Sequence, residues 1–213
     1  MIQGVLFDLD GVLADTEPLQ WQAYRAVLLE LGVDVGLEEY RRHWIADGSG
    51  PEHACAAYGL DLTPDALRAR KALRYRALLE RGVQARPGAA VALARLRRTH
   101  RLAVATNTVR VEVELILDRL GLLSLLDASI AREDYARAKP APDAYLAAAA
   151  ALGLAPADCA VVEDTARGVR AALAAGMLAI AVPNELTFDN DFRGCARRLE
   201  SLDQLTAGLL REL

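Results

Sequence analysis

The sequence IQGVLFDLDG, residues 2–11, holds a short apolar run that ends in two aspartates and a glycine. The run from residue 2 to residue 8 has the length of a strand and is bounded by polar residues, so we predict a strand buried on both faces. In an open parallel sheet, ligands bind outside the carboxyl ends of the strands. Whether Asp8 and Asp10 lie at such a place depends on the sheet that this strand joins.

The chain beyond Arg86-Pro87-Gly88 alternates between strand-like and helix-like segments. Short apolar runs predict the strands, and longer runs with helical spacing predict the helices between them. The predicted strands are 101–106, 128–131, 159–163 and 178–182, and the predicted helices are 89–98, 111–120, 142–152 and 166–175. This alternation produces βαβ units, so the sequence predicts a Rossmann-like parallel sheet with helices on both faces.

The segment between the first strand and residue 87 has a different pattern. Residues 18–31 show helical spacing and lead into Gly32, a residue type common after the last turn of a helix. Residues 38–80 continue as helix-rich sequence without a strand-like run. We therefore predict one α/β core built from residues 1–14 and 87–213, with an all-helical domain of residues 15–86 inserted after the first strand.

Composition and charge are those of an ordinary globular chain. The 213 residues carry a formal net charge of −4, which offers no broad basic field for nucleic acid or an anionic membrane. The apolar stretch 177–183 is too short to span a bilayer, and the start has no basic segment typical of a signal peptide. Three widely spaced cysteines indicate neither a disulfide framework nor a zinc site. We expect a cytoplasmic protein that is a monomer or a weak dimer.

Polar residues that could take part in a reaction follow the predicted strands, at the point where each strand ends. They are Asp8, Asp10 and Gly11 after the first strand, Thr106 and Asn107 after the second, Glu163 and Asp164 at the fourth, and Lys139 between the last two groups. A crowd of carboxylates is costly unless a cation neutralises it, and Mg²⁺ prefers oxygen ligands. One carboxylate can then attack phosphorus while a second acid protonates the leaving group.

Each of these residues also has an ordinary structural explanation. Aspartates after a strand are common turn residues, and threonine or aspartate before a helix is a common N-cap. The Lys139-Pro140 pair also fits an exposed loop. The combination of all these groups in this order, at the ends of strands, favours the functional interpretation.

These residues resemble the motifs of the haloacid dehalogenase superfamily, in the subgroup with a helical cap inserted after the first motif. The matching segments are 8–12, Thr106, 139–143 and 162–165 followed by Gly168. The similarity extends over nearly the whole chain and is weakest in residues 38–80. The resemblance implies a Rossmann-like core with residues 15–86 as the cap.

The resemblance implies chemical roles for three residues. Asp8 would be the nucleophile and a Mg²⁺ ligand, and Asp10 would be the general acid and base, with its backbone carbonyl on the metal. Lys139 would steady the charge of the transferring phosphoryl group. Dehalogenases lack an acid at the position of Asp10, so the resemblance favours a Mg²⁺-dependent phosphatase that forms an aspartyl-phosphate.

The resemblance also implies the ligand contacts. Thr106, Gly11 and the backbone of Asn107 would bind the phosphoryl group. Asp164 would bind Mg²⁺ directly, and Glu163 would bind it directly or through water. The substrate would be a small phosphorylated metabolite, and sugar phosphates, phosphoglycolate and nucleotide monophosphates all stay open.

Two other functions stay open as well. The mutase β-phosphoglucomutase has the same core motifs, but such mutases carry a histidine in the first cap helix and an arginine in the cap loop. Here Gln20 takes the place of the histidine, and the loop 47–52 has no arginine, so a phosphatase is favoured. A non-catalytic binding module is disfavoured, because it needs neither Asp8 nor Asp10.

Residues of the cap are expected to select the substrate. Gln20, Lys71 and Arg74 are the candidates, and the two basic residues would bind a second anionic group. Lysine is rare here, with Lys71 and Lys139 the only lysines among 25 basic residues. The alternative for Lys71 and Arg74 is a solvated helix face, which we favour.

Overall fold

The computed structural model describes residues 1–213, and the chain forms two compact units. Unit 1 contains Met1–Asp15 and Gln84–Leu213, and unit 2 contains Thr16–Val83. Unit 1 is therefore built from both ends of the chain, and unit 2 is inserted into its sequence.

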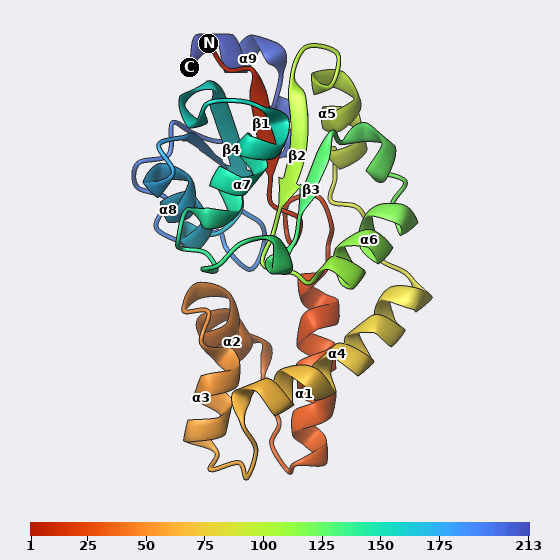
Figure 1. The fold of residues 1–213 in the computed structure, drawn as a ribbon. Helices are drawn as coiled ribbons and strands as arrows, with labels where there is room; N and C mark the ends of the chain where they lie inside the picture. The colour runs from red at the N-terminus through yellow and green to blue at the C-terminus, as the bar shows by residue number, and fades with distance from the viewer. The chain divides into compact units, whose positions relative to one another are not determined.

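A six-stranded parallel sheet forms the centre of unit 1 (Figure 1). Its strands lie in the spatial order β3, β2, β1, β4, β5, β6, and every neighbouring pair is parallel. Their bounds are β1 Gly4–Phe7, β2 Arg101–Ala105, β3 Ala128–Ile130, β4 Cys159–Glu163, β5 Leu178–Ala181 and β6 Arg197–Arg198. The first five agree with the predicted strands to within a few residues at each end.

The central strand β1 aligns the ends of its neighbours. Its residues Val5, Leu6 and Phe7 have no exposed surface, which explains why the sequence there is a continuous apolar run. In the sheet register, Phe7 lies opposite Val104 of β2 and Val162 of β4. The residues that follow the three strands therefore begin at the same edge of the sheet.

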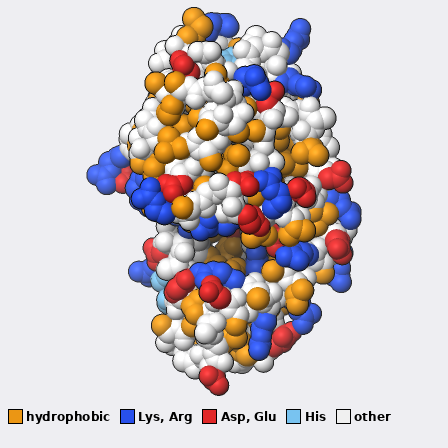
Figure 2. Space-filling view, in the orientation of Figure 1, with side chains coloured by type: hydrophobic (Ala, Val, Ile, Leu, Met, Phe, Trp, Pro, Cys, Tyr) orange, Lys and Arg blue, Asp and Glu red, His pale blue; other side chains and the backbone are white.

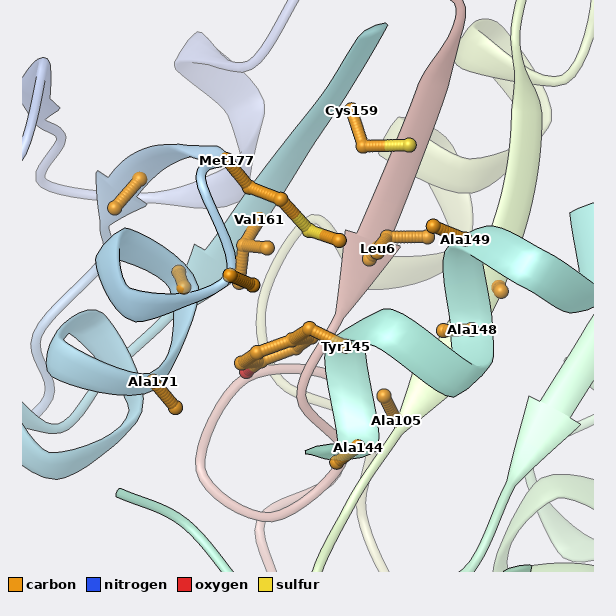
Figure 3. Packing of buried hydrophobic residues seen from close by; sticks show 14 of the residues in the cluster. Leu6, Ala105, Ala144, Tyr145, Ala148, Ala149, Cys159, Val161, Ala171 and Met177 are labelled. Atoms are coloured by element: carbon orange, nitrogen blue, oxygen red, sulfur yellow. The ribbon is translucent and has the colours of Figure 1, made fainter. Parts of the chain in front are cut away.

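Helices cover both faces of the sheet. Helices α7 (Asp143–Leu152) and α8 (Ala166–Ala174) pack on one face, α7 over β1 to β3 and α8 over β4 and β5. Figure 3 shows the small side chains of α7 lying close to Leu6 of β1, which lets the helix approach the sheet. Helices α5 (Ala89–Leu96) and α6 (Arg110–Arg119) lie on the other side (Figure 1). The predicted Rossmann-like α/β fold is confirmed.

Shorter elements complete unit 1. They are α9 (Ala207–Glu212) and the 3₁₀ turns η2 (Leu123–Leu125), η3 (Arg132–Asp134), η4 (Pro156–Asp158) and η5 (Leu202–Gln204). The edge strand β6 was not predicted from the sequence. Its two arginines are exposed and pair with Ile180 and Ala181 of β5. Two arginines contain no apolar run, so the usual strand signal is missing.

Unit 2 consists of helices packed around aromatic side chains. Its helices are α1 (Glu17–Glu30), α2 (Leu37–Tyr40), the π-helix η1 (Arg41–Ala46), α3 (Gly50–Ala57) and α4 (Pro64–Arg81). The ring of Trp44 lies 5.5 Å from the ring of Tyr24 and 5.5 Å from that of Tyr40, measured between centroids. Aromatic pairs at this distance stabilise the packing by more than the burial of their surface alone.

The surface carries charges of both signs. Figure 2 shows acidic and basic side chains interspersed on the face in view, without a broad field of either sign. This mixture agrees with the small net charge of −4. None of the helices combines the length and the hydropathy that a membrane span requires.

The buried position of Leu6 gives a test of the packing. Leu6 has 0% exposure, whereas Leu146 on α7 has 39%. We expect Leu6→Ala to lower the free energy of unfolding by about 3 kcal/mol, because the cavity lies in a core that is buried on both faces of the sheet. The matched variant Leu146→Ala should lower it by less than about 1 kcal/mol. Urea unfolding measures both, and equal losses would contradict the assigned packing.

Candidate active site

Three buried carboxylates meet at the carboxyl edge of the sheet. Asp8 follows β1, Glu163 is the last residue of β4, and Asp164 comes directly after it. Each offers one oxygen, and these oxygens lie within 4.8 Å of one another. Converging carboxylate oxygens suit a hard divalent cation such as Mg²⁺. The donor set therefore fits the metal expected from the sequence.

The ammonium group of Lys139 joins two of these carboxylates. Its Nζ lies 2.5 Å from Oδ1 of Asp8 and 2.8 Å from Oε1 of Glu163, and it donates to the carbonyl oxygen of Ala105 at 2.9 Å. Lys139 is buried in the segment before α7. A buried ammonium needs such partners, because the loss of water is otherwise too costly. The structure thus brings Lys139 into contact with Asp8 and Glu163.

The hydroxyl of Tyr145 contacts the same ion pair, which was not expected from the sequence. It donates to Oε1 of Glu163 at 2.7 Å and accepts from Nζ of Lys139 at 2.7 Å. The side chain extends from the first turn of α7 toward α8 (Figure 3). An aromatic residue in an apolar helix usually signals core packing, so its position six residues after Lys139 is the only clue in the sequence.

Burial and neighbouring charges shift the pKa values of these groups. Burial raises the pKa of Asp8 to about 8, because the loss of water outweighs the attraction of Lys139. Burial alone would raise the pKa of Glu163, but Lys139 holds it below its ordinary value. Burial alone would lower the pKa of Lys139, but the two carboxylates raise it. Lys139 therefore stays charged, and a further cation would help Asp8 to lose its proton.

Glu163 is held through both of its carboxylate oxygens. In addition to the contacts of Oε1, Oε2 accepts from the backbone N–H groups of Asp164 at 3.1 Å and Thr165 at 3.2 Å, and from the Thr165 hydroxyl at 3.0 Å. A Cβ atom at Gly168 would lie 1.7 Å from Oε1. The carboxylate can occupy this place because residue 168 is glycine. Besides the metal contact that was expected for it, Glu163 therefore has a second role: it anchors Lys139.

Two threonine hydroxyls bind the side chain of Asp10. Thr106 Oγ1 donates to Oδ2 of Asp10 at 3.0 Å, and Thr108 Oγ1 donates to the same oxygen at 2.6 Å. The segments after β1 and β2 are thereby tied together. Asp10 and Thr106 were expected at the site from the sequence, whereas Thr108 was not, although Thr106-Asn107-Thr108 contains a second hydroxyl.

The side chain of Asn107 holds the segment that carries Lys139. Its Oδ1 accepts from the hydroxyl of Tyr135 at 2.8 Å and from the backbone N–H of Lys139 at 3.2 Å. Burial raises the pKa of Tyr135 to about 12, so this hydroxyl stays protonated and can donate. Tyr135 is another residue that sequence reasoning missed.

Gly11 allows Asp164 to approach the loop after β1. Its φ of 79° is one that L side chains rarely adopt, and a Cβ atom would lie 2.2 Å from Oδ2 of Asp164. The same Cβ would lie 2.8 Å from Nδ2 of Asn184, which donates to that carboxylate oxygen at 2.7 Å. The family resemblance connects this glycine with phosphate binding. The structure gives a further reason for it, the close approach of Asp164.

The three candidates in unit 2 have different surroundings. Lys71 has only 8% exposure, and its Nζ lies 4.0 Å from the ring centroid of Tyr75. The expected solvated position is therefore wrong for Lys71. Helix α4 carries basic residues on several sides, so its sequence does not reveal which of them is buried. Arg74 is half exposed and pairs with Glu30, as a solvated face requires. Gln20 is partly buried on α1.

The fold and this edge of the sheet together define a class of enzyme. A parallel α/β core with buried acids and a lysine at its strand ends is the arrangement that the haloacid dehalogenase resemblance implied. The sequence matches the haloacid dehalogenase-like hydrolases over residues 2–176, and the chain belongs to this family.

Individual relatives narrow the class. Protein CbbY of Rhodobacter capsulatus is 31% identical over 232 residues, which cover 100% of this chain and 99% of that protein. Fructose-1-phosphate phosphatase YqaB of Escherichia coli (strain K12) is 34% identical over 184 residues, which cover 84% of this chain and 95% of that protein. The crystal structure of a CbbY mutant from Rhodobacter sphaeroides, in complex with xylulose 1,5-bisphosphate, has a TM-score of 0.84 at 32% identity and covers 96% of each chain. The chain is an enzyme of the phosphatase type, as predicted.

Gly11 provides a test of the close approach of Asp164. We expect Gly11→Ala to lower phosphatase activity by about 100-fold, because a displacement of Asp164 on the order of 1 Å disturbs the whole site. The control is Gly32→Ala, where φ is 80° but a Cβ atom meets nothing within 4 Å. It should keep its activity despite a similar backbone strain. Phosphate release measures both, and equal activity of the two variants would contradict the contact.

The raised pKa of Asp8 predicts a pH dependence of stability in metal-free protein. Between the ordinary value of 3.8 and about 8, folded Asp8 holds a proton that unfolded Asp8 has released. Its contribution to the free energy of unfolding therefore falls as the pH rises through this window. Asp8→Asn removes this effect. As the pH rises through this window, the free energy of unfolding of the variant should therefore increase relative to that of the wild type, on the order of 1 kcal/mol per pH unit. Urea unfolding in EDTA measures the difference, and a difference that is constant with pH would disprove it.

Proposed function

We propose that this chain is a Mg²⁺-dependent phosphomonoesterase that acts on a small phosphorylated sugar through an aspartyl-phosphate at Asp8. The observation that carries the proposal is the buried ammonium of Lys139 between Asp8 and Glu163. It supplies fixed positive charge at a place where three carboxylates converge. A dianionic phosphate can approach such carboxylates only where positive charge offsets theirs.

Asp8 and Asp10 divide the chemistry in this proposal. In the first step an oxygen of Asp8 forms a bond to phosphorus while the bond from phosphorus to the ester oxygen breaks. Asp10 gives its proton to that ester oxygen, so the sugar leaves as an alcohol. In the second step Asp10 takes a proton from water, and the water oxygen attacks phosphorus. Inorganic phosphate leaves and the Asp8 carboxylate is restored.

Hydrogen bonds within unit 1 support these assignments. The hydroxyls of Thr106 and Thr108 hold one oxygen of Asp10, and fixing one oxygen of a planar carboxyl group also fixes the direction of the other. We assign phosphoryl binding to Thr106, to the backbone of Asn107 and to the loop at Gly11. Backbone can approach a phosphate closely at a glycine, because there is no Cβ atom.

Four residues are proposed to hold the metal. They are Asp8, Asp164, Asp10 through its backbone carbonyl, and Glu163 directly or through water. When bound, Mg²⁺ offsets the negative charge of the phosphate and of the Asp8 carboxylate. Both oxygens of Glu163 already accept hydrogen bonds, which supports contact through water. The buried oxygens of Asp8 and Asp164 support direct contact.

The relatives support a substrate class. The names of two of them contain fructose 1-phosphate and xylulose 1,5-bisphosphate, which are both phosphorylated sugars. We propose a sugar phosphate for this chain, with unit 2 acting as a cap that selects it. Lys71 is our first candidate for a specificity residue, because an ammonium buried against aromatic rings is not an ordinary solvated group. Gln20 follows, and Arg74, already paired with Glu30, comes last.

The main test measures phosphate release from a panel of sugar phosphates, with Mg²⁺ and with EDTA. We expect release that depends on Mg²⁺ and that Asp8→Asn lowers by roughly 1,000-fold or more, because the variant lacks the attacking carboxylate. The control Asp118→Asn changes an exposed carboxylate on α6 and should leave the rate unchanged.

Each competing function predicts another outcome of this test. A β-phosphoglucomutase would interconvert glucose 1-phosphate and glucose 6-phosphate faster than it releases phosphate. A non-catalytic binding module would release no phosphate from any compound in the panel. The phosphatase stays our proposal for two reasons: Gln20 stands at the position where the mutases carry histidine, and the loop 47–52 has no arginine.

A further inference from the structure

The side chain of Asn184 connects two loops of the site. Asn184 follows β5 and is buried. Its Nδ2 donates to Oδ2 of Asp164 at 2.7 Å, and it lies 3.3 Å from the carbonyl oxygen of Gly11 as a second acceptor. One amide group thus contacts the segment after β4 and the segment after β1. Neither the motifs nor the proposed function assigns a role to this residue.

A tight turn fixes the orientation of this amide. The backbone N–H of Leu186 donates to Oδ1 of Asn184 at 2.9 Å. The backbone N–H of Asn184 donates to the hydroxyl of Thr187 at 2.9 Å, and the Thr187 N–H donates to the Asn184 carbonyl at 3.1 Å. Because Oδ1 is used by the turn, the NH₂ end of the amide must face Asp164. The identity of the two amide atoms is therefore set by the hydrogen-bond network.

The contact with Asp164 is separate from the turn. The turn uses the backbone and Oδ1 of Asn184, whereas Nδ2 takes no part in it. A residue that only shaped the turn would need an acceptor and no donor, as serine does in similar turns. Nδ2 packs closely over Gly11, because a Cβ atom at that residue would lie 2.8 Å from it. This packing fixes the position of the donor group as well as that of the turn.

We propose that Asn184 is a positioning residue that fixes the carboxylate of Asp164 for the divalent cation. The inference rests on the proposed function, because it takes Asp164 as a metal ligand. A carboxylate is planar, so a hydrogen bond to Oδ2 also sets the direction of Oδ1. The amide does this without adding charge, which leaves the full negative charge of Asp164 for the cation. Partners that orient a metal ligand in this way commonly change metal affinity by about 10- to 100-fold.

The test is a calorimetric titration of the full chain with MgCl₂. Asn184→Ser keeps a short acceptor for the turn but is too short to reach Asp164. We expect it to raise the Mg²⁺ dissociation constant by about 10-fold. We also expect activity to recover at high Mg²⁺, because the attacking and proton-transferring residues are untouched. Asn184→Ala should show the same loss of affinity, and either variant that folds provides the measurement.

The matched control is Thr187→Val, which removes the hydroxyl that the turn uses and leaves Nδ2 of Asn184 in place. It should lower the thermal stability and leave the Mg²⁺ dissociation constant within about twofold of wild type. Equal weakening in Asn184→Ser and Thr187→Val would overturn the inference in favour of a purely structural turn. Unchanged affinity in Asn184→Ser would overturn it as well. Absence of Mg²⁺ binding to the wild type would overturn the metal itself, and with it the proposed function.

Discussion

The buried ammonium of Lys139 is the interaction on which the site depends. An ion in such surroundings costs several kcal/mol unless charged or polar partners surround it, and here two carboxylates and a backbone carbonyl do so. Lys139 supplies one positive charge, whereas Asp8, Glu163 and Asp164 can supply three negative ones. The excess of negative charge adds to the effect of burial, which is the main cause of the raised pKa of Asp8. It also gives the proposed Mg²⁺ its driving force, because a site with balanced charges would attract no further cation.

The parallel sheet determines that these residues meet. Strands β2 and β4 pair with β1 in a register that brings their last residues to one edge, so three loops begin beside one another. Carboxylates this close need room, and glycines provide it. At Gly11 the missing Cβ atom leaves space for Asp164, and at Gly168 it leaves space for Glu163. The glycines are therefore as much a part of the site as the acids that they accommodate.

The sequence predicted the sheet and the acids well because both follow from local rules. Apolar runs indicated the strands, and the sheet geometry then placed Asp8 and Asp164 at a common edge. The strand β6 was missed because two arginines contain no apolar signal. Lys71 was misplaced for a related reason. Helix α4 carries basic residues on several sides, so helical spacing does not show that this lysine points inward against Tyr75. Which side is buried depends on the neighbouring helices and not on α4 alone.

Tyr145, Thr108 and Asn184 were missed for a different physical reason. Each is a neutral hydrogen-bond donor, a kind of residue that is common everywhere, and each gains its role only from a contact across the fold. Tyr145 contacts Glu163, Thr108 contacts Asp10, and Asn184 contacts Asp164. A charged donor such as arginine would orient a carboxylate as firmly, but it would also neutralise it. The neutral donor Asn184 fixes the direction of Asp164 and preserves its charge, whereas Glu163 is held by the Tyr145 hydroxyl and by the ammonium of Lys139 together. The acids and the lysine thus set the charge of the site, and the hydroxyls and the amide help to set its geometry.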